Sequence, residues 1–219
     1  MRIAYVVDVH DDFDSVERTV RQLAPLDLLI VGGDITTGGT PEQAADAVER
    51  WRPLAPRLLA LAGNMDSAAI EARLHQLGVA LDSRGVVVGD VGIFGVSAAP
   101  RSPLHTPYEL DEAELARRIE AAYADIRDSR IRIFCPHAPP QGTACDRLRS
   151  GEHVGSTAVR AFIEHAQPDL VLCGHIHEAR GTDTIGRTRI VNPGPAAASH
   201  YALVEVKDDV HVRLDDRGG

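Results

Sequence analysis

The chain has 219 residues, of which 44% are hydrophobic and 25% are charged, and its formal net charge is −9. A chain of this length can bury a sizeable core as one unit, and we expect residues 1–219 to form a single domain. The negative charge argues against a general nucleic-acid or polybasic membrane-binding role, because both kinds of partner require clustered cations. A small anionic substrate is compatible with this charge, since a bound metal ion can outweigh the net charge locally.

We expect neither a membrane-spanning segment nor a secretion signal in this sequence. No segment approaches the roughly 20 apolar residues that a transmembrane helix requires. The N-terminus runs directly into a strand-like pattern, without the apolar region and cleavage site of a signal peptide. Cys135, Cys145 and Cys173 are too few and too scattered for a disulfide framework, and we expect Cys135 and Cys173 to be reduced, packed thiols. These features favour a cytoplasmic protein.

Short apolar runs alternate with amphipathic stretches over the first 80 residues. The expected strands cover residues 2–7, 27–31 and 57–62, and the expected helices cover 12–23, 41–51 and 66–78. Thr40 is a suitable N-cap for the second helix, with Pro41 at its first position, and Gly78 is a suitable C-cap for the third. Successive strand–helix units of this kind are typical of a mainly parallel sheet.

The pattern changes after this point. Residues 85–98 predict two strands joined by a Gly-Asp turn, and residues 108–129 predict a long, charged amphipathic helix. The remaining expected elements are strands at 130–135 and 168–173, a helix at 156–167, and C-terminal hairpins that turn at 185–187 and 208–209. Two irregular stretches remain, 98–108 and 136–155, and long loops in compact domains are often functional.

Polar side chains collect where the expected buried strands end. In chain order they are Asp8, His10, Asp34, Asn64, His137, His175 and His177. Because the carboxyl ends of strands in open α/β sheets share one rim, we expect these side chains to converge there. Two carboxylates, four imidazoles and one amide oxygen exceed the needs of one ion, but they suffice for two ions that share a bridging carboxylate. The glycines before Asp34, Asn64 and His175 are expected to let the backbone turn sharply.

These motifs, read in order, resemble the calcineurin-like metallophosphoesterase family across most of the chain. The matching motifs are "DVH" (8–10), "GGD" (32–34), "GN" (63–64), "PH" (136–137) and "GHIH" (174–177). The resemblance implies an α/β fold, a four-layer α/β/β/α sandwich of two mixed β-sheets flanked by helices, with a dinuclear metal site at the sheet edge.

Later segments narrow the resemblance to one branch of the family. Residues 139–156, 174–181 and 192–195 look like the small, uncapped branch. That branch includes phosphodiesterases active on simple aryl phosphodiesters, and relatives used as protein scaffolds.

The resemblance also implies a role for each of the seven side chains. Asp8, His10 and His177 would hold the first metal ion, Asn64, His137 and His175 the second, and Asp34 would bridge the two. A hydroxide held by both ions would attack phosphorus in line, and Asn64 would also contact the substrate. Nitrogen and oxygen donors without thiolate suit divalent transition metals; we expect Mn first, with Fe, Zn, Ni or Co as alternatives.

Met65 departs from the family pattern. Many members carry a histidine at this position, which protonates the leaving group and is oriented by the aspartate that follows. Met65 has no proton to give, whereas Asp66 is still present. Asp66 could orient a group near the metal ions, but capping of the following helix is its simpler role. Because general-acid catalysis is lost at this position, we expect turnover of aryl phosphodiesters and weak activity on alkyl phosphomonoesters.

The long loop after His137 holds further candidates. His153 is the candidate proton donor, and Arg147 and Arg149 suit recognition of a substrate phosphate, with a solvated loop as the alternative. Glu178 is either a hydrogen-bonding partner of a metal ligand or a surface residue. His75 and His165 lie within amphipathic helices, where surface or boundary positions are expected.

The leading hypothesis is therefore a dinuclear-metal phosphoesterase that hydrolyses phosphodiester or phosphomonoester bonds of a small substrate. The alternatives are a catalytically weak binding or scaffold protein, which the missing histidine favours, and a nuclease, which the charge of −9 disfavours. A protein phosphatase is disfavoured because the chain is too short for the additional loops with which such enzymes bind protein substrates. The sequence does not determine the oligomeric state.

Overall fold

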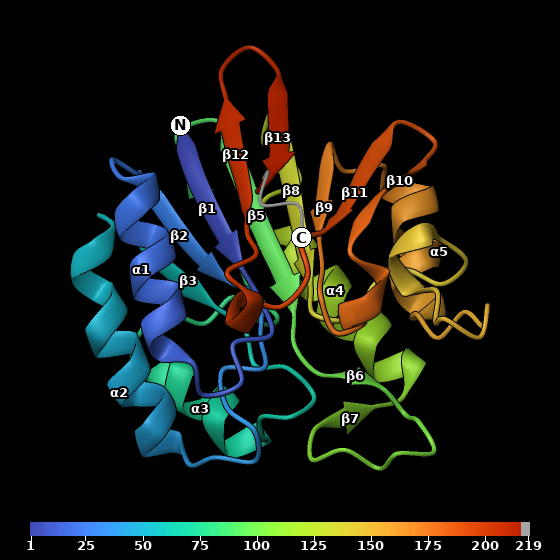
Figure 1. The fold of residues 1–219 in the computed structure, drawn as a ribbon. Helices are drawn as coiled ribbons and strands as arrows, with labels where there is room; N and C mark the ends of the chain where they lie inside the picture. The colour runs from blue at the N-terminus through green and yellow to red at the C-terminus, as the bar shows by residue number, and fades with distance from the viewer. Residues whose placement is uncertain (216–219) are drawn as a thin grey trace.

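The computed structural model describes residues 1–215 and consists of two stacked β-sheets with helices on both outer faces (Figure 1). The first sheet has the strand order β13-β12-β1-β2-β3. Its strands are β1 (Arg2–Val6), β2 (Leu28–Val31), β3 (Leu58–Ala60), β12 (Ala202–Val206) and β13 (Val210–Leu214). The three N-terminal strands are parallel, and the C-terminal hairpin adds to β1 in antiparallel fashion.

The second sheet has the strand order β10-β11-β9-β8-β5-β4. Its strands are β4 (Gly85–Val88), β5 (Val91–Val96), β8 (Ile131–Pro136), β9 (Leu170–Leu172), β10 (Gly181–Ile185) and β11 (Thr188–Asn192). The four inner strands are parallel, and both edge strands are antiparallel to their neighbours. A small separate pair is formed by β6 (Ala99–Pro100) and β7 (Glu109–Leu110).

The helices complete a four-layer arrangement. On the first sheet lie α1 (Phe13–Leu23), α2 (Pro41–Trp51) and α3 (Ala68–Gln76), and on the second sheet lie α4 (Glu112–Ala124) and α5 (Thr157–Ala166) (Figure 1). Three apolar layers hold the sandwich together. Trp51 lies in the layer between the first helices and their sheet, Leu172 between the two sheets, and Phe134 beneath α4 and α5. The four-layer α/β/β/α fold confirms the predicted fold class.

Most predicted elements are confirmed, and the local chemistry explains their ends. Thr40 Oγ1 accepts a hydrogen bond from the Gln43 N–H, and Gln43 Oε1 accepts one from the Thr40 N–H, which closes a capping box at the start of α2. The hairpin between β4 and β5 and both C-terminal hairpins occur as predicted. The three cysteines are buried free thiols, as predicted for Cys135 and Cys173.

Several predicted ranges were too long. The helix predicted over 66–78 covers only Ala68–Gln76, and the strand predicted over 168–173 covers only Leu170–Leu172. The helix predicted over residues 108–129 covers only Glu112–Ala124, because Asp111 accepts a hydrogen bond from the Glu114 N–H as its N-cap and residues 109–110 pair with β6 instead. The strand predicted over 57–62 forms only Leu58–Ala60. Within residues 1–215, no helix is both long enough and apolar enough to cross a membrane.

Candidate metal centre

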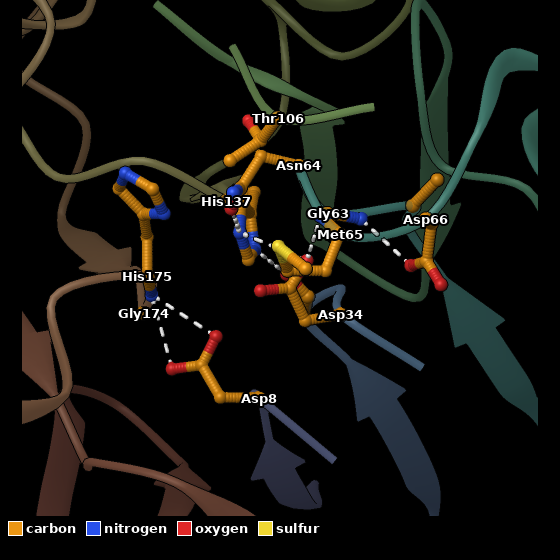
Figure 2. A network of polar contacts seen from close by, with 12 residues as sticks. Asp8, Asp34, Gly63, Asn64, Met65, Asp66, Thr106, His137, Gly174 and His175 are labelled. Atoms are coloured by element: carbon orange, nitrogen blue, oxygen red, sulfur yellow. Dashed lines mark hydrogen bonds and ion pairs between the residues drawn. The ribbon is translucent and has the colours of Figure 1, made fainter. Parts of the chain in front are cut away.

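The seven predicted ligands follow the ends of five strands, three of the first sheet and two of the second. Figure 2 shows five of them, Asp8, Asp34, Asn64, His137 and His175. From the first sheet, Asp8 and His10 follow β1, Asp34 follows β2 and Asn64 follows β3. From the second sheet, His137 follows β8, and His175 and His177 follow β9. Each oxygen donor therefore comes from the first sheet, and three of the four imidazoles come from the second.

Asp8, His10 and His177 form the first cluster of donors. One potential ligand atom of each residue lies within 4.8 Å of the others. The His10 and His177 Nε2 atoms are 3.1 Å apart, and His177 Nε2 is 3.7 Å from Asp8 Oδ2. His10 Nδ1 pairs with Thr37 Oγ1 at 3.0 Å, so the Nε2 atom of His10 faces the other two donors.

His137 and Asn64 form the centre of the second cluster. His137 Nδ1 lies 3.0 Å from the Gly32 carbonyl oxygen, which can only accept, so the neutral ring carries its proton on Nδ1. His137 Nε2 is then an acceptor, and it faces another acceptor, Asn64 Oδ1, at 3.0 Å. Two acceptors at this distance repel each other unless a cation lies between them. The ring of His175 is 5.3 Å from that of His137, centroid to centroid.

Asp34 lies between these two clusters. Its Oδ2 atom is 3.7 Å from His10 Nε2, and its Oδ1 atom is 3.6 Å from His137 Nε2. Oδ1 also accepts a hydrogen bond of 2.7 Å from the Met65 N–H. One carboxylate oxygen therefore faces each cluster.

Burial controls the charge state of these side chains. Burial, together with the charge of Asp34, raises the pKa of Asp8 well above its ordinary value. Burial also raises the pKa of Asp34 to about 7, although the Met65 N–H opposes this rise. Desolvation lowers the pKa of His137 to about 4 and that of His175 to about 3, so both rings are neutral at physiological pH. Neutral imidazoles beside two crowded carboxyl groups fit divalent metal ions, which relieve the repulsion between the carboxylates.

The backbone at the candidate ligands adopts an uncommon conformation. Positive φ angles occur at Asp8 (55°), His10 (48°), Asp34 (48°) and His175 (67°). Residues with a side chain rarely adopt the left-handed region, and such conformations cluster at functional sites. No local sequence pattern indicates this conformation directly.

The prediction that the preceding glycines make these turns is correct only for Gly33, whose φ is +110°. Gly63 and Gly174 have no positive φ, so that prediction was wrong for them. Both glycines instead permit close approach. A Cβ atom on Gly63 would lie 2.1 Å from Asp34 Oδ1, and one on Gly174 would lie 2.3 Å from Val7 Cγ2.

Asp66 does not cap α3, so the capping prediction was wrong. Ser67 is the N-cap, and its Oγ accepts a hydrogen bond of 3.2 Å from the Ile70 N–H. The buried Asp66 carboxylate instead accepts four hydrogen bonds, from the N–H groups of Ile35 (3.0 Å), Thr36 (2.8 Å) and Gly63 (2.9 Å) and from Thr36 Oγ1 (2.8 Å). It therefore ties the segment that follows Asp34 to the residue that precedes Asn64. Burial, then the charge of Asp34, raises the pKa of Asp66 to about 6 against the opposing effect of these N–H groups.

Met65 contributes to this edge through its backbone. Its N–H donates to Asp34, and its carbonyl oxygen accepts from the Gly38 N–H at 2.8 Å. The half-buried thioether extends among the candidate ligands (Figure 2). The backbone contacts do not depend on which side chain stands at this position.

A short loop over the site was recognised in the sequence only as an irregular stretch. Glu109 accepts hydrogen bonds from the N–H and hydroxyl groups of both Ser102 and Thr106, and the Tyr108 N–H donates to the Asn64 carbonyl oxygen at 3.0 Å. Burial opposes ionisation of Glu109, but these donors together lower its pKa to about 2. The loop is therefore attached to Asn64 through Tyr108.

The candidates in the long loop divide between two cavities. His153 and Arg147 line a cavity of about 590 Å³, and His175 and His177 line one of about 400 Å³. The two cavities share Leu148, Arg149 and Glu178. Glu178 Oε1 accepts a hydrogen bond of 2.6 Å from the Arg149 N–H, and its Oε2 is 3.4 Å from Arg149 Nε. Arg149 and Glu178 thus lie beside the candidate ligands, whereas His153 and Arg147 line the neighbouring cavity.

Comparison with known proteins identifies the family of the chain. Residues 1–179 match the model of the family described as calcineurin-like phosphoesterase. An uncharacterized protein of Methanocaldococcus jannaschii is 29% identical over 225 residues, with 100% of this chain and 98% of that protein covered.

Two solved structures share the fold. A protein from Thermus thermophilus has a TM-score of 0.74 at 17% identity, with 97% of each chain covered. A dimetal phosphatase from Danio rerio has a TM-score of 0.62 at 11% identity, with 98% of this chain and 95% of that chain covered. At these identities the structural likeness shows the fold alone, whereas the family match covers most of the chain. The chain belongs to the calcineurin-like phosphoesterase family, whose members are metal-dependent hydrolases of phosphate esters.

Proposed function

We propose that the protein is a single-domain, cytoplasmic, dinuclear-metal phosphodiesterase that acts on a small substrate. The observation that carries this proposal is the position of Asp34. Its two carboxylate oxygens face histidines of different clusters, with Oδ2 3.7 Å from His10 Nε2 and Oδ1 3.6 Å from His137 Nε2. A carboxylate in this position is suited to bridge two ions.

The residues would divide between the ions as the family resemblance implies. Asp8, His10 and His177 would hold one ion, and Asn64, His137 and His175 the other, with Mn²⁺ as the expected metal. When bound, two ions supply an activated water nucleophile and stabilise charge on the phosphoryl oxygens. The chain's own contribution is to hold the neutral imidazoles in place, for example through the 3.0 Å contact between His137 Nδ1 and the Gly32 carbonyl oxygen.

The thioether of Met65 supports a preference for good leaving groups. A phenolate departs without protonation, whereas an alkoxide needs a proton donor, and Met65 cannot act as one. We therefore expect aryl phosphodiesters to be hydrolysed well and alkyl phosphomonoesters poorly.

The experiment that tests the function is a metal-dependent activity screen. Protein stripped of metal is assayed with Mn²⁺, Ni²⁺, Co²⁺, Zn²⁺ or Fe²⁺ against phosphomonoesters, phosphodiesters and cyclic nucleotides. We expect hydrolysis of bis(p-nitrophenyl) phosphate that depends on the added metal. No stimulated hydrolysis with any of these ions would contradict the proposal and favour a binding or scaffold protein. Salt-sensitive cleavage of DNA would favour a nuclease instead.

Met65→His is expected to broaden the range of leaving groups. The new imidazole would supply the missing proton, so hydrolysis of alkyl phosphodiesters should rise by up to about 10²-fold while aryl phosphodiesters change little. The measurement is kcat/KM across a series of esters with leaving groups of increasing pKa. Met65→Leu, which adds no proton, serves as the matched control. An unchanged dependence on the leaving group in Met65→His would show that position 65 does not set it.

His153 is our proposed proton donor for slower substrates, with Arg147 and Arg149 as proposed contacts to the substrate phosphate. His153 lines the cavity that adjoins the candidate ligands, and its Nδ1 lies 2.7 Å from Asp146 Oδ1, so the buried carboxylate orients the ring and leaves Nε2 available. We expect His153→Gln to slow the hydrolysis of alkyl esters about 10-fold more than that of aryl esters. His165→Gln, on α5, is the control. Equal effects on both ester classes would argue against this role.

A further inference from the structure

A second group of possible metal ligands lies outside the candidate metal centre. Glu71 and His75 stand one helical turn apart on α3, and Asp82 lies in the segment that leads from α3 to β4. One ligand atom from each residue lies within 4.8 Å of the other two, and His75 Nε2 is 3.4 Å from Glu71 Oε1. The sequence predicts only a surface or boundary position for His75.

Glu71 carries a buried acceptor atom without a donor. The residue is 5% exposed, and its Oε1 atom has no hydrogen-bond partner among residues 1–215, since the approach of His75 does not form a hydrogen bond. Its Oε2 atom accepts a hydrogen bond of 3.3 Å from the Ala62 N–H. Buried polar atoms are normally satisfied, so the free oxygen on the side of His75 indicates a missing partner.

The charges around Glu71 are not balanced. Asp82 is buried, and Arg118 Nη1 contacts its Oδ2 atom at 3.0 Å. Arg118 also pairs with Glu114, with Nε 2.8 Å from Glu114 Oε1, so this guanidinium is shared between two carboxylates, whereas Arg117, within residues 1–215, pairs with Glu114 alone. Burial, reinforced by the charge of Asp82, raises the pKa of Glu71 to about 8. Because Arg118 contacts Asp82, the buried carboxylate of Glu71 requires either a proton or a further cation.

We propose that Glu71, His75 and Asp82 form a third divalent-metal site, suited to Zn²⁺. Zn²⁺ binds both imidazole nitrogen and carboxylate oxygen and can complete its coordination with water, whereas Mg²⁺ and Ca²⁺ prefer oxygen ligands throughout. The His75 side chain is 38% exposed, so an ion can reach the site from solvent. The ion takes the place of the proton on Glu71, so binding releases a proton.

The position of this site indicates a structural role. Glu71 is hydrogen-bonded to Ala62, two residues before Asn64, and the Asp82 Oδ1 atom accepts a hydrogen bond of 2.8 Å from the Ser97 N–H at the end of β5. A bound ion would therefore join α3, the end of β3 and the end of β5. It would stabilise the folded chain without taking part in the reaction.

The test is the number of Zn²⁺ ions bound per chain after equilibrium dialysis of the stripped protein. His75→Ala is expected to bind one ion fewer than the unmodified chain, and His165→Ala, another histidine in the last turn of a helix, the same number. Glu71→Gln is expected to lose the same ion as His75→Ala, with its fold checked by circular dichroism. Calorimetric titrations in two buffers of different ionisation enthalpy should show a smaller proton release for His75→Ala.

Identical Zn²⁺ stoichiometry in the unmodified chain and His75→Ala would overturn this proposal. It would indicate that a proton, and not a metal ion, neutralises Glu71. The readout is independent of turnover. If the protein shows no phosphoesterase activity at all, the difference in bound Zn²⁺ between the unmodified protein and His75→Ala still decides whether the third site exists. If the protein is active, His75→Ala should retain the Mn²⁺-dependent rate.

Discussion

Asp34→Asn is expected to lower metal-dependent phosphodiester hydrolysis more than ~100-fold. Loss of a group that only supports a ligand typically costs about 10–100-fold in metal affinity or activity, and Asp34 would itself contact both ions. Asparagine replaces one of the two carboxylate oxygens by an amide nitrogen, which cannot bind a cation. Residue 34 would then lose its contact with one of the two ions, either the ion on the side of His10 or the ion on the side of His137.

The measurement is kcat/KM for bis(p-nitrophenyl) phosphate together with the metal content per chain. Asp46→Asn, on the exposed face of α2, is the matched control and should behave as the unmodified protein. Full activity and an unchanged metal content in Asp34→Asn would undermine the assignment of this carboxylate as a bridge.

Asp66→Ala is expected to lower the free energy of unfolding by about 3 kcal/mol or more. The substitution leaves buried N–H groups of Ile35, Thr36 and Gly63 without an acceptor, and each such group costs about 1–3 kcal/mol. Because Asp66 joins the segments that carry Asp34 and Asn64, metal affinity should fall as well, by about 10–100-fold. Denaturant unfolding of the metal-free protein and a separate metal titration measure the two effects.

Ser67→Ala provides the comparison that separates this role from helix capping. Ser67 is the true N-cap of α3, and loss of such a cap costs about 1 kcal/mol. Metal affinity should be nearly unchanged in this variant. If Ser67→Ala were as damaging as Asp66→Ala to both stability and metal affinity, the connection between the two segments would not be the main role of Asp66.

The layout of the candidate centre could be predicted because it depends on a short-range pattern. Buried parallel strands are recognisable as apolar runs, and the residue types that follow them are read directly from the sequence. The first polar residues after β1 and β2, for example, are Asp8 and Asp34, and the parallel pairing of these strands brings their ends together. Neither inference requires knowledge of a distant contact.

Other features depend on contacts that local pattern does not reveal. Asp66 precedes a helix, as an N-cap does, but its donors at Ile35 and Thr36 lie about 30 residues earlier in the chain. Glu71 and Asp82 are likewise ordinary acidic residues in sequence, and only the folded chain buries them together, with Glu71 hydrogen-bonded to Ala62 after β3 and Asp82 hydrogen-bonded to Ser97 after β5. The left-handed backbone at the ligands is also imposed by tertiary structure.

The candidate ligands are divided between the two sheets, and this division would link metal binding to the assembly of the fold. The oxygen donors belong to the first sheet and most of the imidazoles to the second, so a folding intermediate with the sheets apart would contain neither complete cluster. Ions that bind only the docked sheets favour docking by mass action, by about 2.7 kcal/mol at an ion concentration near 100 times Kd. Docking of the two sheets would thus be stabilised both by the apolar layer between them and by the bound metal ions. The metal-bound protein would resist separation of its two sheets more than local fraying of its outer helices.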